Sequence, residues 1–205
     1  MVIHRYDLYR VLYEEACTVG VVVLFSQHVV SLDLTAPSAT LSSGATYTGD
    51  LIVGADGGRS DCRNAVLGRR VALKDSGIHV FRFMIPKQRV ASIPHLAYLV
   101  EPPCINLLVG PGGPSMMYCV KRDDLLNVVL AMNHDGIEDP PMPHHEVDIS
   151  LVKEEFSEWG LVQDLLGLAD RCIRWTLIES EIWEKWVEGR TVLIGDACHI
   201  MTPFV

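Results

Sequence analysis

The sequence predicts a mixed α/β chain, with α+β character, in which a mostly antiparallel sheet interrupts a partial parallel one. Two apolar runs, at 51–55 and 191–194, each lead into Gly and Asp, as parallel strands do where they end at a ligand site. Between them, residues 78–129 hold several β-type runs separated by Pro and Gly, which indicates an antiparallel sheet. The predicted architecture is therefore a partial Rossmann-like domain with an inserted sheet.

The composition favours a globular protein that does not bind nucleic acid. Hydrophobic residues make up 49% of the 205 residues and charged residues 21%, as in folded domains. A net charge of −9 disfavours a nucleic-acid partner, because contacts to phosphates require a basic surface.

Targeting signals and membrane spans are not expected. The longest apolar run, residues 19–25, is far shorter than the ~20 residues of a membrane helix, and we predict a buried strand there. Polar residues 4–7 interrupt the stretch that a secretory signal would need. The six cysteines include no CxxC pair, which favours reduced thiols and an intracellular, cytoplasmic protein.

Local patterns predict the order of the elements. Apolar residues at helical spacing indicate an amphipathic helix over 6–16, and residues 19–34 and 39–56 are expected to form successive strands. A short helix should follow, with Ser60 or Asp61 as its cap and Gly68 at its end. The middle β-type runs are HVFRFMI, HLAYLV, INLLV, SMMYCV and LLNVVLAM. An apolar helical stripe runs from residue 156 to residue 166.

We accordingly expect three segments. Residues 1–75 should form part of the parallel-sheet domain, and residues 76–150 should form the inserted sheet. Residues 151–205 should supply a helix and then return to the first domain.

The two Gly-Asp strand ends are the strongest chemical signal. Asp56 and Asp196 follow the apolar runs, where a carboxylate can accept hydrogen bonds from ribose or ribityl hydroxyls. Gly57 and Gly195 lack side chains, so the backbone can approach a large ligand there. The alternative is that Gly-Asp only makes a turn after a strand, but two such ends on one chain favour a ligand site.

These segments resemble those of a known family. Residues 54–63 (GADGGRSDCR) resemble the DG motif, and residues 195–203 (GDACHIMTP) the GD motif, of class A flavoprotein monooxygenases such as salicylate and p-hydroxybenzoate hydroxylases. Residues 4–8 (HRYDL) are similar to that family's HRxDL segment, and the motif order agrees along nearly the whole chain. The resemblance implies an FAD-binding domain with an inserted substrate domain. It also implies an FAD-dependent oxidoreductase that uses NADPH or NADH and molecular oxygen to hydroxylate a phenolic or polyketide-like aromatic molecule.

The resemblance assigns roles to individual residues. Arg5 would contact FAD, Val29 would border the adenine, and Asp56 with Gly57 would lie near the pyrophosphate and the nicotinamide nucleotide. Gly195 and Asp196 would bind the ribityl chain, and Pro203 would lie beside the isoalloxazine.

The resemblance also places two substrate residues in the middle sheet. Arg82 and Tyr118 would bind and activate a phenolate, because a guanidinium stabilises the anion that makes the ring nucleophilic. The alternative is that both are ordinary strand residues. No metal site is expected: His144, His145 and Glu146 are predicted to lie in a solvated, Pro-rich loop.

The sequence departs from the family pattern in three places. It has no G-x-G-x-x-G phosphate loop; residues 110–114 (GPGGP) contain two prolines between β-type runs and cannot open a helix. It stops at Val205, directly after the GD motif, and Pro114 stands where the family has His. We therefore expect a truncated gene model or a partial copy of a longer gene, and we expect the chain as it stands to bind FAD poorly. The alternatives are an inactive remnant or interaction module of the family, or a nicotinamide-dependent dehydrogenase or methyltransferase on a Rossmann-type sheet.

Overall fold

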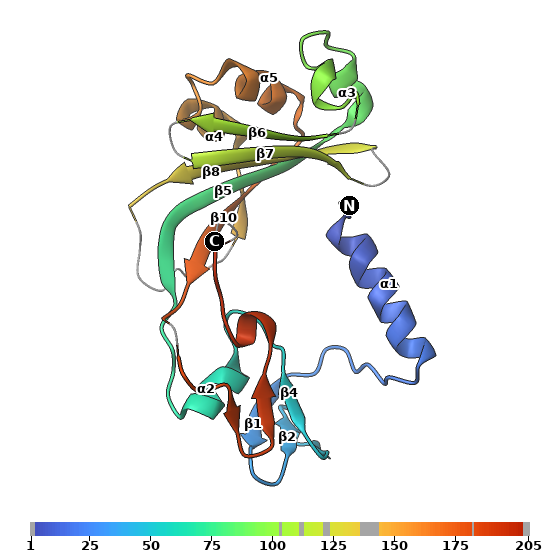
Figure 1. Cartoon of the computed structure of the whole chain (residues 1–205), viewed down its shortest axis with the longest axis vertical. Coiled ribbons are helices and arrows are strands. Elements are labelled where there is room, and N and C mark those ends of the chain that lie inside the picture. The colour runs from blue at the N-terminus through green and yellow to red at the C-terminus, as the bar shows by residue number, and fades with distance from the viewer. Residues whose placement is uncertain are drawn as a thin grey trace. The chain divides into compact units, whose positions relative to one another are not determined.

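The computed structural model describes residues 3–102, 104–110, 113–120, 124–135, 144–181 and 183–202. These residues form two compact units, which are described separately (Figure 1). The first unit holds the described residues within 3–21, 77–135 and 144–177, and the second those within 22–76 and 178–202. The three-segment division into 1–75, 76–150 and 151–205 stays a prediction.

A six-stranded sheet forms the centre of the first unit, in the order β6-β7-β8-β5-β10-β9. Its strands are β5 (Lys74–Pro86), β6 (Ile105–Gly110), β7 (Gly113–Val120), β8 (Leu125–Asn133), β9 (His144–Val147) and β10 (Cys172–Glu179). The pairs β6–β7, β7–β8, β5–β8 and β9–β10 are all antiparallel, so the predicted mostly antiparallel sheet is confirmed.

Helices cover one face of this sheet and create the main core. They are α3 (Lys87–Ala91), the 3₁₀ turn η1 (Ala97–Leu99), α4 (Ile149–Glu155) and α5 (Gly160–Leu168) (Figure 1). Alternate residues of β5, such as Phe81 and Phe83, are buried against Phe156 and Leu165 from the helical side. The predicted apolar stripe is confirmed, although it divides between α4 and α5.

One predicted strand of this unit is wrong. Residues 95–100 (HLAYLV) contain η1, because Leu96, Leu99 and Val100 recur at helical spacing and are all buried in the core. His144 and His145 were expected in a loop but begin β9, where they pair with Trp175 and Arg174 of β10.

The helix predicted over 6–16 is confirmed as α1 (Arg5–Thr18). The His4 side chain accepts a hydrogen bond from the Tyr6 backbone N–H, and Asp7 places a negative charge in the first turn, which stabilises a helix start. No residue of α1 is buried, so its apolar stripe is exposed rather than packed. No helix in the described ranges is long and apolar enough to cross a membrane.

The second unit contains two small sheets and one helix. β1 (Val29–Asp33), β2 (Ser38–Leu41) and β3 (Thr46–Thr48) form an antiparallel sheet, while β4 (Ile52–Gly54), β12 (Thr191–Leu193) and β11 (Val187–Glu188) form another. β4 and β12 are parallel, as the sequence predicts. The helix α2 (Asp61–Leu67) is capped by the Ser60 side chain and ends at Gly68, whose φ of 66° is left-handed.

Two further strand predictions are wrong in detail. Residues 19–25 form no strand, and Val22 is 81% exposed, because no described strand lies beside them to satisfy the backbone groups. The apolar middle of residues 51–55 is typical of a central parallel strand, which is covered on both faces. Instead Val53 is 50% exposed, because the described chain covers only the other face of β4.

Candidate functional site

The two predicted Gly-Asp motifs lie at the same edge of one sheet. The parallel register pairs Val53 with Val192 and Gly54 with Leu193, so both strands end together. Asp56 follows the first strand, and Asp196 lies in the 3₁₀ turn η2 (Gly195–Ala197) after the second. The carboxyl ends of parallel strands are the usual ligand side of an open α/β sheet.

Hydrogen bonds from the start of α2 fix the Asp56 carboxylate. Its Oδ1 accepts from the Ser60 hydroxyl at 2.5 Å, and its Oδ2 accepts from the Cys62 backbone N–H at 3.0 Å. Burial tends to raise the pKa of Asp56, but these hydrogen bonds outweigh it and the pKa is lowered overall. The side chain is therefore a charged, oriented acceptor at neutral pH.

Arg63 joins the two motif loops and was not identified from the sequence. It is 1% exposed, and its guanidinium donates to the backbone oxygens of Gly58 and, at 3.4 Å, Asp196. The guanidinium also lies over the Trp183 ring, 5.0 Å from the centroid. A signal was present: Arg63 lies three residues before Val66 on α2, so both occupy the face that packs inward.

A cavity of about 590 Å³ lies beside the first motif. Val29 and Asp56 both line it, with the rest of residues 27–32 and part of α2, so the predicted adenine and pyrophosphate residues share one space. Its volume is within the range of small-molecule sites. Gly57 and Gly195 have φ of 82° and 59°, and nothing lies within 4 Å of the position of an added Cβ. Backbone is thus open to a ligand in both loops.

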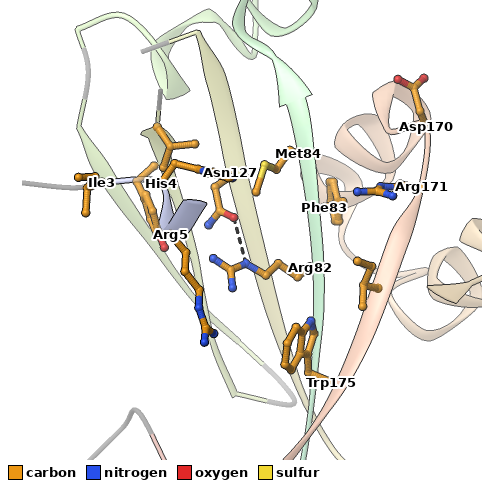
Figure 2. A pocket seen from close by; sticks show the side chains of 13 residues that line it. Ile3, His4, Arg5, Arg82, Phe83, Met84, Asn127, Asp170, Arg171 and Trp175 are labelled. Atoms are coloured by element: carbon orange, nitrogen blue, oxygen red, sulfur yellow. Dashed lines mark hydrogen bonds between the residues drawn. The ribbon is translucent and has the colours of Figure 1, made fainter. Parts of the chain in front are cut away.

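A second pocket, in the first unit, brings together the predicted substrate residues (Figure 2). It has a volume of about 350 Å³, and Arg82, Tyr118 and Arg5 all line it. Arg82 donates through Nε to the Asn127 Oδ1 at 3.2 Å. Neither Asn127 nor Trp175, another lining residue, was singled out from the sequence, because only strand pairing reveals that they share this face.

The roles predicted for these residues stay predictions. Arg5 is the first residue of α1 and belongs to the first unit, and Asp56 and Asp196 belong to the second. Pro203 lies outside the described residues.

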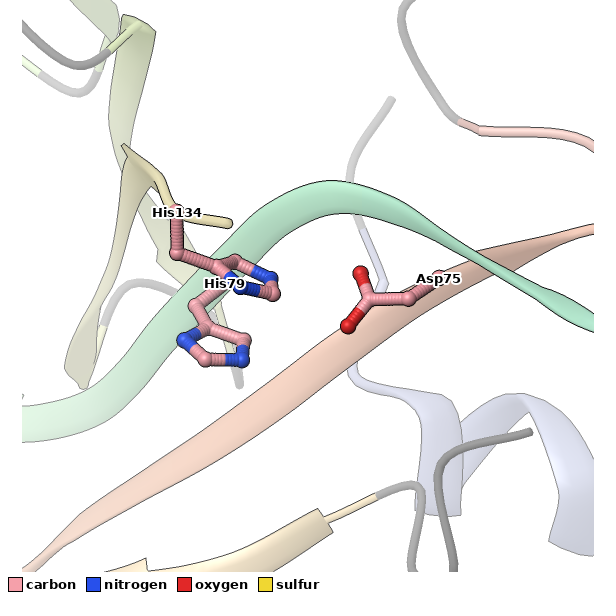
Figure 3. Close-up of side chains that lie close together, drawn as sticks. All are labelled: Asp75, His79 and His134. Atoms are coloured by element: carbon pink, nitrogen blue, oxygen red, sulfur yellow. The ribbon is translucent and has the colours of Figure 1, made fainter. Parts of the chain in front are cut away.

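Two histidines at one end of β5 are the nearest approach to a metal site. The rings of His79, on β5, and His134, directly after β8, stack with centroids 3.4 Å apart and planes 16° apart, and Asp75 precedes His79 on β5 (Figure 3). A metal ion lies near the plane of each imidazole that binds it, so two rings stacked face to face do not direct their lone pairs at one point. This cluster is therefore not a preorganised metal site.

The geometry defines a class of protein: a dinucleotide-type strand edge with two Gly-Asp loops, together with an antiparallel sheet that carries a cation-lined pocket. The family model described as FAD binding domain matches residues 1–205. The chain belongs to this family.

Individual relatives agree with this placement. The chain is 28% identical to hispidin-3-hydroxylase of Neonothopanus nambi, over 99% of this chain and 53% of the relative. It is 27% identical to 6-methylsalicylate 1-monooxygenase of Aspergillus terreus, over 78% of this chain and 36% of the relative. The chain thus spans about half the length, or less, of the curated relatives it matches.

Solved structures show the same fold. A salicylate hydroxylase substrate complex matches with a TM-score of 0.79 and 24% identity, covering 98% of this chain and 52% of that one. The structure of CtdE with FAD and a substrate matches with a TM-score of 0.80 and 19% identity, over 95% of this chain and 50% of that one. The predicted fold class, an FAD-binding domain with an inserted antiparallel sheet, is confirmed.

Proposed function

We propose that this chain forms the FAD-binding and substrate-binding part of a flavin-dependent monooxygenase that hydroxylates an aromatic small molecule. The observation that carries the proposal is the pocket in which Arg82 and Tyr118 meet on the open face of the six-stranded sheet. Family membership supplies the cofactor class, and the named relatives are monooxygenases and hydroxylases. NADPH or NADH would be the reductant and molecular oxygen the co-substrate, in an intracellular protein.

The second unit fits FAD in its shape and in its donor set. The cavity beside β1 and α2 has room for a nucleotide, and the Asp56 carboxylate at its wall can accept from ribose hydroxyls. Gly57 and Gly195 leave backbone N–H groups open to phosphate or ribityl oxygens. When bound, the flavin supplies the electron transfer from the nicotinamide to oxygen, which no protein side chain can perform.

The first unit would bind and polarise the ring to be hydroxylated. A guanidinium beside a phenol favours the ionised form, because its positive charge lowers the pKa of the phenol and this attraction is stronger in a partly apolar pocket than in water. Arg82 on β5 donates a hydrogen bond to Asn127 on β8, and Tyr118 on β7, the next strand beyond β8, would offer a hydroxyl to the same pocket. Met84 and Ile173 add apolar walls that exclude water from the ring.

The first test measures FAD binding to the 205-residue chain, with quenching of flavin fluorescence during titration as the readout. We expect weak but saturable binding, and we expect Asp56→Asn to weaken it about tenfold further, which corresponds to one lost charge-assisted hydrogen bond. Asp50→Asn is the matched control, because Asp50 is exposed and lies outside the cavity. Absence of saturable binding, or equal affinity in both variants, would contradict the proposal.

A further inference from the structure

A third cavity, of about 310 Å³, lies in the second unit and has no part in the proposed function. Its walls come from the end of β10, from the segment before β11 and from residues 198–202, which follow η2. No described residue lines both this cavity and the cavity beside Asp56. The two cavities therefore offer different chemistry to a ligand.

An accessible aromatic ring forms part of the wall of this third cavity. Trp186 and Met201 line it and are 47% and 57% exposed. The Trp186 indole N–H donates to the Trp183 backbone oxygen at 3.1 Å, which restricts the orientation of the Trp186 ring, and the His199 ring lies 6.1 Å from it. Trp183 also lines the cavity, but it is 6% exposed and Arg63 lies over its ring. Trp186 is therefore the aromatic surface that a ligand can reach.

The charged side chains of this wall are acidic. Glu179 and Glu181 line the cavity, whereas no Lys or Arg does so in the described part of the chain. Glu181 pairs with Arg69 at 2.7 Å, so its charge is partly compensated, and the exposed Glu179 supplies a second carboxylate. Arg63 lies outside the lining, and the nearby Asp56 carboxylate offsets its charge. The cavity thus favours a positively charged ligand.

This combination of groups fits an organic cation better than a metal ion. The face of a Trp ring attracts a cation through the ring quadrupole, and a carboxylate adds a Coulomb attraction. The methyl groups of an alkylated ammonium ion can pack against rings and thioether carbon, which bind quaternary ammonium compounds in other proteins. A metal ion such as Ca²⁺ or Mg²⁺ instead requires several oxygen ligands around one point.

We propose that the cavity beside Trp186 binds small tertiary or quaternary ammonium compounds, with Trp186 as the aromatic wall and Glu179 as the counter-charge. This inference does not depend on the proposed function. It adds a ligand of another chemical class, at a place that the aromatic substrate and the cofactor do not occupy.

The test observes the Trp186 ring directly, with tetramethylammonium chloride as the probe. The chain has four tryptophans, and the indole N–H signal of Trp186 in a ¹H–¹⁵N correlation spectrum is assigned by its loss in Trp186→Phe. At pH 8, where imidazole side chains are ordinarily neutral, we expect a saturable shift of this signal in the millimolar range. The probe replaces sodium chloride, so that the ionic strength stays constant. Tert-butyl alcohol, a neutral molecule of similar size, should bind at least about tenfold more weakly.

Variants separate the ring from the charge. Trp186→Leu removes the aromatic face and should weaken tetramethylammonium binding about tenfold, whereas Trp186→Phe keeps a weaker face and should lose about threefold. Glu179→Gln changes only an exposed side chain, leaves folding intact and should also weaken binding about threefold. Glu184→Gln is the matched control, because it removes the same charge from an exposed residue that does not line the cavity.

Every other result contradicts the inference. Absence of a saturable shift, equal binding of tert-butyl alcohol, or unchanged affinity in Trp186→Leu or Glu179→Gln would each overturn it. An equal loss in Glu179→Gln and Glu184→Gln would show that only the overall charge attracts the probe. Displacement of tetramethylammonium by FAD would assign the cavity to the cofactor site instead of a separate one. The fluorescence titration with FAD tests the proposed function independently of all these results.

Discussion

The Arg63→Met variant tests how strongly one buried cation stabilises the two motif loops. Methionine keeps most of the side-chain volume but removes the hydrogen bonds to the Gly58 and Asp196 oxygens and the contact with Trp183. Hydrogen bonds to charged groups contribute roughly 1.5–3 kcal/mol each, and a cation–π contact about 0.5–2 kcal/mol. Burial of the guanidinium opposes these gains and lowers the pKa of Arg63. We therefore expect a net loss of about 3 kcal/mol.

The assay is urea unfolding of the whole chain, monitored by tryptophan fluorescence. Trp183, which lies beside Arg63, contributes to this signal. Arg10→Met is the matched control: Arg10 and its partner Glu14 are 57% and 63% exposed and 4.0 Å apart. An exposed pair of this kind contributes at most about 0.5 kcal/mol. Arg63→Lys should fall between the two, because it keeps the charge but loses the planar fork. A change of less than about 0.5 kcal/mol in Arg63→Met would refute the reasoning.

Three further predictions concern packing and charge. Gly54→Ala should destabilise the chain by about 1–3 kcal/mol in thermal unfolding, because the new Cβ meets Cys62 Cβ at 2.7 Å. Gly49→Ala is the control, because its new Cβ would meet only atoms at 3.6 Å or more. Equal melting temperatures of the two variants would contradict the expected effect of the clash at Gly54. Phe156→Ala should cost about 3–5 kcal/mol in urea, since Phe156 is fully buried; a cost below about 1 kcal/mol would show that the core collapses around the gap. The lowered pKa of Asp56 predicts that the stabilising contribution of this carboxylate is complete at neutral pH. The contribution is lost as the pH falls below the ordinary pKa of 3.8 and through the lower pKa of the folded state. Unfolding from pH 7 to pH 3 should accordingly show a shallower acid loss in Asp56→Asn, and identical pH profiles would exclude this linkage.

Local sequence patterns were sufficient for the strand-end motifs. An apolar run followed by Gly and Asp is recognised from a few neighbouring residues, so the parallel pair β4–β12 could be predicted, and the helix cap could be narrowed to Ser60 or Asp61, of which Ser60 is the cap. Residues 19–25 show the limit of the same method. An apolar run forms a strand only if a neighbouring strand pairs with it, and no strand among the described residues pairs with residues 19–25.

The residues that sequence reasoning missed are those whose roles depend on strand order. Asn127 and Trp175 lie 48 positions apart, on β8 and β10, and β5 lies between these strands in the sheet. Neither belongs to a motif, and an Asn or Trp in a β-type run is unremarkable by itself. They come together only through the strand order, because β5, which carries Arg82, lies between their two strands and all three residues line one pocket.

The motif residues of the second unit also stabilise its fold, which changes how their variants should be interpreted. The buried apolar cluster there is small, built on Val66, Leu193 and Cys198. Hydrogen bonds therefore contribute more to the stability of the two motif loops. Asp56 accepts hydrogen bonds from the start of α2, and Arg63 donates to both motif loops. If the proposed FAD site is correct, loss of flavin affinity in an Asp56 variant would combine a lost ligand contact with a looser loop, whereas an Arg63 variant would act through the loops alone. Val29 lies on the cavity wall, is 37% exposed and has no such polar link, so its variants can separate ligand binding from folding.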